Sequence, residues 1–177
     1  MKKFNVIFKD IIIKDRESIV NEWTSKAWDQ CFSRGNSGMS CSSMPGCNTD
    51  IPLKHIFVAG LERIFDELID GKLPDIKHPM LNDVIAILAI QDSAPSKALS
   101  FYTMLTSLIK NRFKKQLLEE EMNNQFIVFI ENINNAMGVS FDIYMNIRER
   151  LFNLKIKEIM ASNSRLLKMA KLITNET

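Results

Sequence analysis

The sequence predicts an all-α fold that ends in a long helix, and three features of the chain support this prediction. Glycine and proline are scarce, with six and five residues among 177, whereas turn-rich β folds use both often. Apolar residues recur at the three- and four-residue spacing that places them on one face of a helix. No segment alternates apolar and polar residues in the manner of a strand. The length suits one domain with a substantial core, so residues 1–177 are expected to form a single domain.

Two helices and a polar segment are predicted in the first part of the chain. The first helix runs from about Phe8 to Asp29. Residues 33–50 are mostly Ser, Gly and Asn with almost nothing to bury, which predicts a mobile loop. Asp50 suits the N-cap of the second helix, Pro52 fits its first turn, and Gly71 ends it. The apolar stripe of this second helix consists of Leu53, Ile56, Phe57, Leu61, Ile64, Phe65 and Leu68.

Two more helices follow in the middle of the chain. A short one is predicted to span Leu81 to Ala89. Asp92 or Ser93 is expected to cap the next helix, with Pro95 in its first turn. This helix ends in a cluster of cations, which suits the negative end of the helix dipole. The cluster comprises Lys110, Arg112, Lys114 and Lys115.

The last segment predicts a long helix with one continuous packing seam. Ile130, Met137, Tyr144 and Leu151 recur every seven residues, a period close to that of a coiled coil. A seam of this length can serve the core of the domain and still contact a partner, which predicts a homodimer. The predicted dimer seam consists of Ile130, Ile133, Met137, Tyr144, Ile147, Leu151 and Leu154. In all, five or six helices with short connections indicate a helical bundle or a globin-like packing.

The charge is nearly balanced overall but not along the chain. Lys and Arg number 23 against 21 Asp and Glu. Cations outnumber acids from Arg148 to Lys171, and residues 160–177 form a basic tail. Such a tail is compatible with an anionic partner. Because Phe152 is the single aromatic residue among these cations, nucleic acid is not the expected partner.

The cysteines give a weak signal for a metal or redox site. Cys31, Cys41, Cys47 and His55 are possible ligands, but nine, five and seven residues separate them in turn. Zinc sites favour closely spaced pairs, because a tight turn preorganises two ligands. We therefore expect no metal site, and reduced thiols.

No cofactor is predicted either. Haem needs an axial ligand, usually His, inside an apolar pocket. His78 precedes Pro79 in a loop, and His55 lies in the first turn of its helix. Neither position suits a proximal ligand.

The chain carries no recognisable catalytic motif, so no enzymatic activity is expected. A nucleophile elbow, a paired Cys and His, and a phosphate-binding glycine loop are all absent from the sequence. The acidic residues of the second helix predict a solvated face. They are Glu62, Asp66, Glu67 and Asp70.

The cytoplasm is the expected compartment. Lys9, Asp10, Lys14 and Asp15 interrupt the apolar residues at the start of the chain, which argues against a signal peptide. No run of about 18 apolar residues is long enough for a membrane-spanning helix.

Two blocks of the sequence carry a family likeness. The first joins Gly60–Gly71 to Ile85–Leu105, and its matching residues are Ala89, Ile90, Gln91, Asp92, Pro95, Ser96 and Ala98. The second covers Phe141–Ile159, with matches at Phe141, Asp142, Tyr144, Met145, Arg148 and Glu149. Together they resemble the N-terminal domain of RsbRD-type proteins, the co-antagonists of the RsbT kinase in bacterial stress signalling. The likeness covers residues 10 to 160, and Leu88 stands where the family usually has arginine.

This resemblance implies a helical sensor domain related to the non-haem globin domain of stressosome proteins. Such domains form homodimers and pass a signal to a partner at the C-terminal helix. The motif residues that could sense the signal are Gln91, Asp92, Pro95, Ser96, Tyr144 and Arg148. Residues 91–93 also have a local explanation, because they end one helix and cap the next.

Three functional hypotheses follow. The leading one is a non-enzymatic sensory or regulatory domain that acts through protein contacts and dimerises along its final helix. The first alternative is a carrier of a small molecule or cofactor, with a pocket among the second, third, fourth and fifth predicted helices. The second is an accessory subunit of a redox complex that uses Cys31, Cys41 and Cys47 to contact a redox protein.

Overall fold

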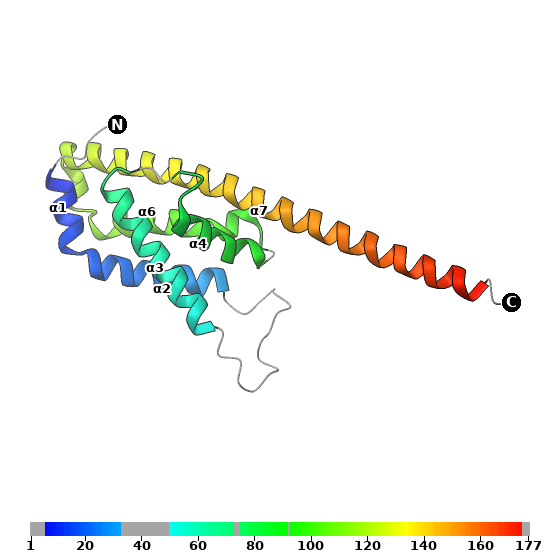
Figure 1. Cartoon of the computed structure of the whole chain (residues 1–177). Coiled ribbons are helices and arrows are strands. Elements are labelled where there is room, and N and C mark those ends of the chain that lie inside the picture. Colours follow the sequence, from blue (N-terminus) through cyan, green and yellow to red (C-terminus); the bar gives the residue numbers. More distant parts are fainter. Residues whose placement is uncertain (1–5, 33–49, 73–74, 92, 175–177) are drawn as a thin grey trace. The chain divides into compact units, whose positions relative to one another are not determined.

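A computed structural model of the chain describes the backbone of residues 6–32, 50–72, 75–91 and 93–174, and the side chains of 8–32, 53–72, 75–91 and 93–166. These residues confirm the all-α prediction, because they form helices and no strand. The α-helices are α1 (Val6–Lys14), α2 (Arg16–Phe32), α3 (Asp50–Ile69), α4 (Pro79–Ile90), α5 (Pro95–Ala98), α6 (Ser100–Arg112) and α7 (Glu120–Thr174), and a 3-10 helix, η2, spans Gln116–Leu118 (Figure 1). Residues 33–49 of the predicted loop lie outside the described residues, and so do Cys41 and Cys47 within it. Asp92 also lies outside them.

The chain divides into two compact units, and α7 contributes to both. Unit 1 comprises Met1–Tyr144 and unit 2 comprises Met145–Thr177. Within the described residues, no helix is long and apolar enough to cross a membrane.

Two of the predicted helices are interrupted. The helix expected from Phe8 to Asp29 is divided at Asp15 into α1 and α2. The helix expected after Pro95 is divided at Leu99 into the short α5 and the longer α6. Apolar spacing alone does not reveal either break, because the stripe continues through both.

The core of unit 1 lies between α2, α3, α4 and α6. The helix α3 packs against α4 and α2, and α2 packs against α6. Gly60 permits the close contact between α3 and α4, since a Cβ atom there would lie 2.2 Å from Val84 Cγ2. Gly71 adopts a positive φ of 68° just after α3, which confirms the predicted end of that helix. Trp23 is fully buried and donates a hydrogen bond from Nε1 to the carbonyl of Phe101 at 2.7 Å.

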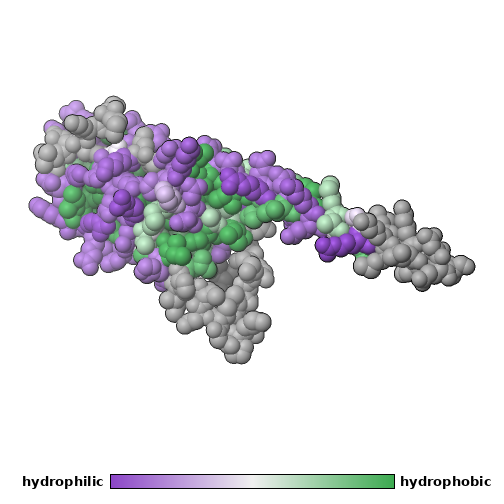
Figure 2. All heavy atoms as spheres, in the orientation of Figure 1, coloured by the Kyte–Doolittle hydropathy of each residue, from purple (hydrophilic) through white to green (hydrophobic). Residues whose placement is uncertain are grey.

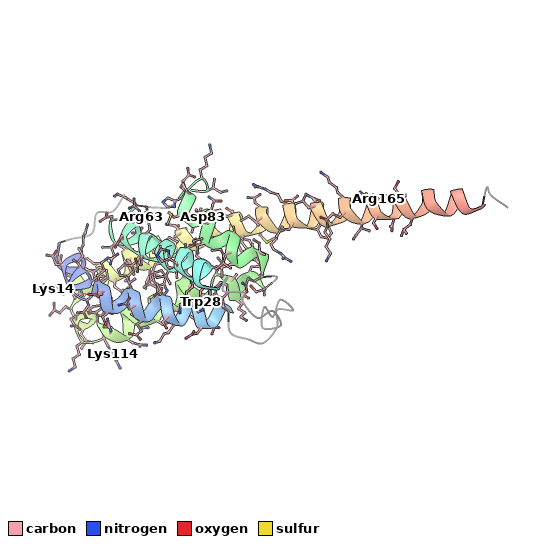
Figure 3. The ribbon with its side chains drawn as sticks, turned by 60° about the horizontal axis from the view of Figure 1, so that its bottom comes forward. Lys14, Trp28, Arg63, Asp83, Lys114 and Arg165 are labelled. Atoms are coloured by element: carbon pink, nitrogen blue, oxygen red, sulfur yellow. The ribbon has the colours of Figure 1, made fainter. Side chains whose placement is uncertain are left out.

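Aromatic rings join the end of α2 to the start of α3. Trp28, labelled in Figure 3, stacks on Phe32 with 4.0 Å between ring centroids. Both rings meet Phe57 edge-on, at 5.7 and 5.4 Å. Lys54 Nζ lies 5.7 Å from the Trp28 ring centroid, a cation–π arrangement.

The buried face of α7 within unit 1 differs from the predicted seam. Its buried side chains alternate four and three residues apart, as in a coiled coil. They are Met122, Phe126, Phe129, Ile133, Ala136, Ser140 and Ile143, with Gln125 and Tyr144 beside them. Of the predicted seam residues in this unit, Ile133 and Tyr144 are buried, while Ile130 and Met137 are half-buried. Phe129 therefore packs into the core of unit 1, whereas its neighbour Ile130, in the predicted dimer seam, is half-buried.

The acidic residues of α3 are not simply a solvated face, which corrects that expectation. Asp66 accepts two hydrogen bonds from Arg16, at 2.7 and 2.8 Å. Lys9 donates to Asp70 at 2.6 Å, and this bond lowers the pKa of Asp70. These pairs attach α1 and the start of α2 to α3.

Candidate functional site

The turn between α4 and α5 carries three of the motif residues that the structure describes, Gln91, Pro95 and Ser96. Gln91 caps the C-terminus of α4, and its N–H donates to the Leu88 carbonyl at 3.3 Å. The predicted cap of the next helix is wrong for Ser93, because Ala94 is the N-cap of α5 and no side chain caps it. Pro95 occupies the first turn as predicted, and Ser96 is exposed. Gln91 therefore has the local structural role that the sequence suggested.

The side chain of Tyr144, in α7, contacts this turn. Its side chain is 1% exposed, and its hydroxyl donates a short hydrogen bond to the carbonyl of Ser93. A carbonyl between two helices has no partner within either of them, so a side-chain donor from elsewhere satisfies it. The two sequence blocks that carry the resemblance, far apart in the chain, thus meet at Ser93 and Tyr144.

A second buried contact joins α6 to α7 near the same end of unit 1. Tyr102 Oη lies 2.8 Å from Ser140 Oγ, and Ser140 Oγ donates to the Ala136 carbonyl at 2.8 Å. Because the Ser140 proton is used in that bond, Tyr102 is the donor to Ser140. Burial raises the pKa of Tyr102, so its hydroxyl stays neutral.

These hydrogen bonds can transmit a change of position between the helices. Tyr144 and Tyr102 each connect α7 to a different part of the α4–α6 region through a hydrogen bond of the phenolic hydroxyl. Such bonds fix the register of packed helices and break or shift as units. The sequence identified Tyr144 through the motif, whereas nothing in the spacing distinguished Tyr102 or Ser140.

The weak metal candidates that can be located do not form a cluster. Cys31 is buried at the end of α2, with its Sγ 4.0 Å from the Ala98 carbonyl, while His55 is exposed on α3. In the described parts of the chain, no three His, Cys, Asp or Glu residues are placed to hold a metal ion. Arg148, the last of the motif residues, is half-buried and belongs to unit 2.

His78 has a structural role instead. It is the N-cap of α4, and its Nδ1 accepts a hydrogen bond from the N–H of Leu81 at 3.2 Å. Its Nε2 lies 3.0 Å from Glu67 Oε1. Since Nδ1 accepts, the proton is on Nε2 and is donated to Glu67. This histidine connects α3 to α4.

Cys31 is expected to be unreactive in the folded protein. Burial raises the pKa of its thiol from 9.0 to about 11, so the thiolate fraction at pH 8 is about 100-fold below that of an ordinary cysteine. In a Cys41→Ser/Cys47→Ser variant, iodoacetamide should modify Cys31 at least that much more slowly in buffer than in urea. Equal rates, measured by mass spectrometry, would mean that Cys31 is accessible and ionised.

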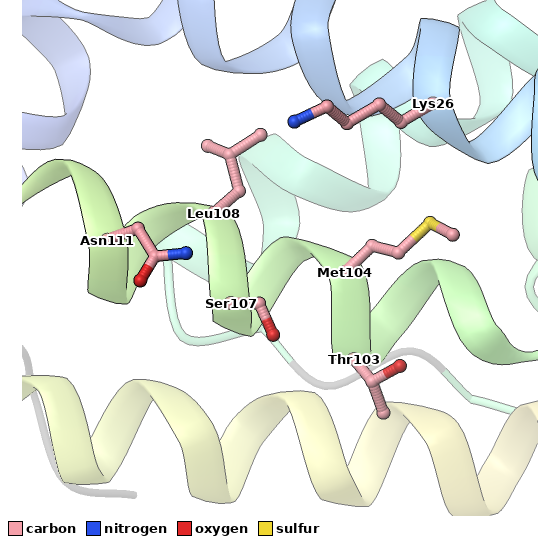
Figure 4. Close-up of a pocket in the computed structure, with 6 residues that line it drawn as sticks. All are labelled: Lys26, Thr103, Met104, Ser107, Leu108 and Asn111. Atoms are coloured by element: carbon pink, nitrogen blue, oxygen red, sulfur yellow. The ribbon is translucent and has the colours of Figure 1, made fainter.

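A shallow groove of about 240 Å³ lies between α2 and α6. In Figure 4, Lys26 reaches from α2 toward Met104 and Leu108 of α6. Thr103, Ser107 and Asn111 complete the lining. The Lys26 ammonium pairs with Glu22 at 2.7 Å, so its charge is already partly balanced.

No family model, curated protein or solved structure matches this chain.

Proposed function

We propose that the chain is a non-enzymatic sensory or regulatory domain of the cytoplasm, which acts through protein contacts made by α7. One observation carries this proposal. Up to Tyr144 the helix α7 is held in the core of unit 1 by buried contacts, and the same helix then continues with exposed apolar side chains. A change at the α4–α5 turn can therefore reach a surface suited to binding. The resemblance to the sensor domain of RsbT co-antagonists supports a role in stress signalling.

The exposed apolar residues of unit 2 support self-association. Met145, Phe152, Ile159 and Leu166 recur every seven residues and are 45%, 64%, 51% and 61% exposed. Figure 2 shows such apolar atoms among the polar ones along this segment. A heptad line of this kind is the pattern of a helix that pairs with another helix. Because Ile133 and Tyr144 are buried within unit 1, we assign the homodimer contact to this line rather than to the seam predicted from the sequence.

A double substitution on this line tests the homodimer. We expect the wild-type chain to sediment as a dimer at tens of micromolar, and Phe152→Glu/Ile159→Glu to be monomeric, because four carboxylates would enter the apolar interface. Helical circular dichroism should be unchanged. Asn153→Glu is the matched control, since Asn153 is exposed on the same turn but off the line. A monomeric wild type, or a dimeric double variant, contradicts the proposal.

The groove between α2 and α6 supports a second function, the binding of a small molecule or cofactor, although it lies between the first and fourth predicted helices and not where the sequence placed the pocket. Its volume of about 240 Å³ suits a small ligand. Native mass spectrometry and an absorbance spectrum of the purified chain test this alternative. If native mass spectrometry detects a bound molecule on the wild-type chain but not on Met104→Trp, whose larger side chain fills the groove, the carrier function would be favoured over the regulatory one.

A further inference from the structure

Unit 2 carries a second apolar face, distinct from the heptad line proposed for self-association. Ile147, Leu151 and Leu154 follow one another at four and three residues, so they lie on one side of the helix. At 3.6 residues per turn, this side is about a third of a turn away from Phe152 and Ile159. Leu154 is 57% exposed, and Ile147 and Leu151 are half-buried.

Cations border this face on both sides. Arg148 and Lys155 follow Ile147 and Leu154 directly, and Arg150 and Lys157 lie on the opposite edge. In heptad terms, Ile147 and Leu154 occupy d positions and Leu151 an a position. The first pair of cations then occupies e and the second occupies g. Arg150, Lys155 and Lys157 are exposed. Figure 3 shows side chains extending from this helix up to the labelled Arg165.

A second copy of the chain does not fit this face. In a parallel pair of helices, g positions meet e positions of the partner, and in an antiparallel pair each meets its own kind. Since e and g are all cationic here, either arrangement places like charges together. Like charges across a helix interface disfavour pairing.

A membrane surface and a nucleic acid fit less well than a helix. A helix that lies on a membrane needs one wide apolar face, whereas Lys155 and Arg148 separate the two apolar faces here. A nucleic acid would place phosphates against Leu151 and Leu154, which offer them no hydrogen bond. Charge complementarity therefore favours a protein helix with acidic edges.

We propose that Ile147, Leu151 and Leu154, with their cationic borders, bind an amphipathic helix of a partner protein that has apolar residues at a and d and acidic residues at e and g. This surface rests on the proposed regulatory function and names the class of partner. Its test is separate from that of self-association, because the two faces use different residues.

Two synthetic four-heptad peptides serve as probes, both with Leu at a and d, one with Glu and the other with Lys at e and g. Fluorescence anisotropy with the full chain should show that the Glu peptide binds at least about tenfold more tightly than the Lys peptide. Added salt should weaken this binding. Lys155→Glu/Lys157→Glu should abolish the preference, because two acids then balance Arg148 and Arg150 at the edges of the face. Lys114→Glu/Lys115→Glu is the control, because it changes the net charge equally at exposed lysines of unit 1.

Three outcomes would overturn the proposal. They are binding of neither peptide, equal binding of both, and an unchanged preference in Lys155→Glu/Lys157→Glu. Binding to phosphatidylglycerol vesicles that requires Lys155 and Lys157, without binding of the Glu peptide, would assign the face to a membrane instead. The dimer-disrupting variant Phe152→Glu/Ile159→Glu should retain peptide binding, so a failed dimer test and a failed peptide test can be told apart.

Discussion

Replacing Gly60 by alanine is expected to lower the free energy of unfolding by about 1–3 kcal/mol. Alanine usually stabilises a helix relative to glycine by up to about 1 kcal/mol, so the sign is opposite to the ordinary one. The reason is the contact between α3 and α4, where the new Cβ would lie 2.2 Å from Val84 Cγ2. Val84 is fully buried and β-branched, so it cannot rotate away without a new clash. Urea unfolding followed by circular dichroism measures the change.

Gly138 provides the matched control for this prediction. No atom lies within 4 Å of a Cβ placed there, so Gly138→Ala in α7 should be neutral or stabilising by up to about 1 kcal/mol. The double variant Gly60→Ala/Val84→Ala should lose less stability than the sum of the two single losses, because Val84→Ala removes the methyl group that clashes with the new Cβ. If Gly60→Ala and Gly138→Ala shift stability equally, the α3–α4 helices do not approach this closely.

Replacing Ser140 by alanine is expected to cost about 1–3 kcal/mol of stability, because the buried Tyr102 hydroxyl would then lose its acceptor. Tyr102→Phe should cost less, since Ser140 still donates to the Ala136 carbonyl. The double variant Tyr102→Phe/Ser140→Ala should be no less stable than Ser140→Ala alone, as both polar partners are gone. Chemical unfolding of the three variants gives the coupling energy.

If the stability losses of Tyr102→Phe and Ser140→Ala simply add in the double variant, this would contradict the contact between α6 and α7. The same variants also test the role of the contact in coupling. If the bond positions α7, Ser140→Ala should alter the hydrogen exchange of α7 amides near Ala136 more than those of α3.

The strongest helical patterns in the sequence predicted the corresponding helices, and their ends followed from local chemistry. Gly71 ends α3 because only a residue that tolerates a positive φ suits that position. Pro95 lies in a first turn as expected. The breaks at Asp15 and Leu99 were missed because neither residue disrupts the apolar spacing.

The candidate site was predicted in part. Tyr144 was identified by resemblance, but its partner is a backbone carbonyl, that of Ser93, which has no sequence signature. Tyr102 and Ser140 are 38 residues apart, and their pairing depends on how α6 lies against α7. The seam predicted for a dimer and the buried face of α7 in unit 1 lie in neighbouring registers, because apolar residues occupy adjacent positions such as Phe129 and Ile130.

We expect the helix after Tyr144 to bind a second copy of the chain. Hydrogen–deuterium exchange of the wild-type chain, recorded from low to high micromolar concentration, measures this self-association. Self-association through this surface predicts that amides of residues 145–166 gain protection as the concentration rises, while those of α2, α3 and α4 do not change. Exchange in residues 145–166 that is independent of concentration, with the chain monomeric throughout, would contradict it.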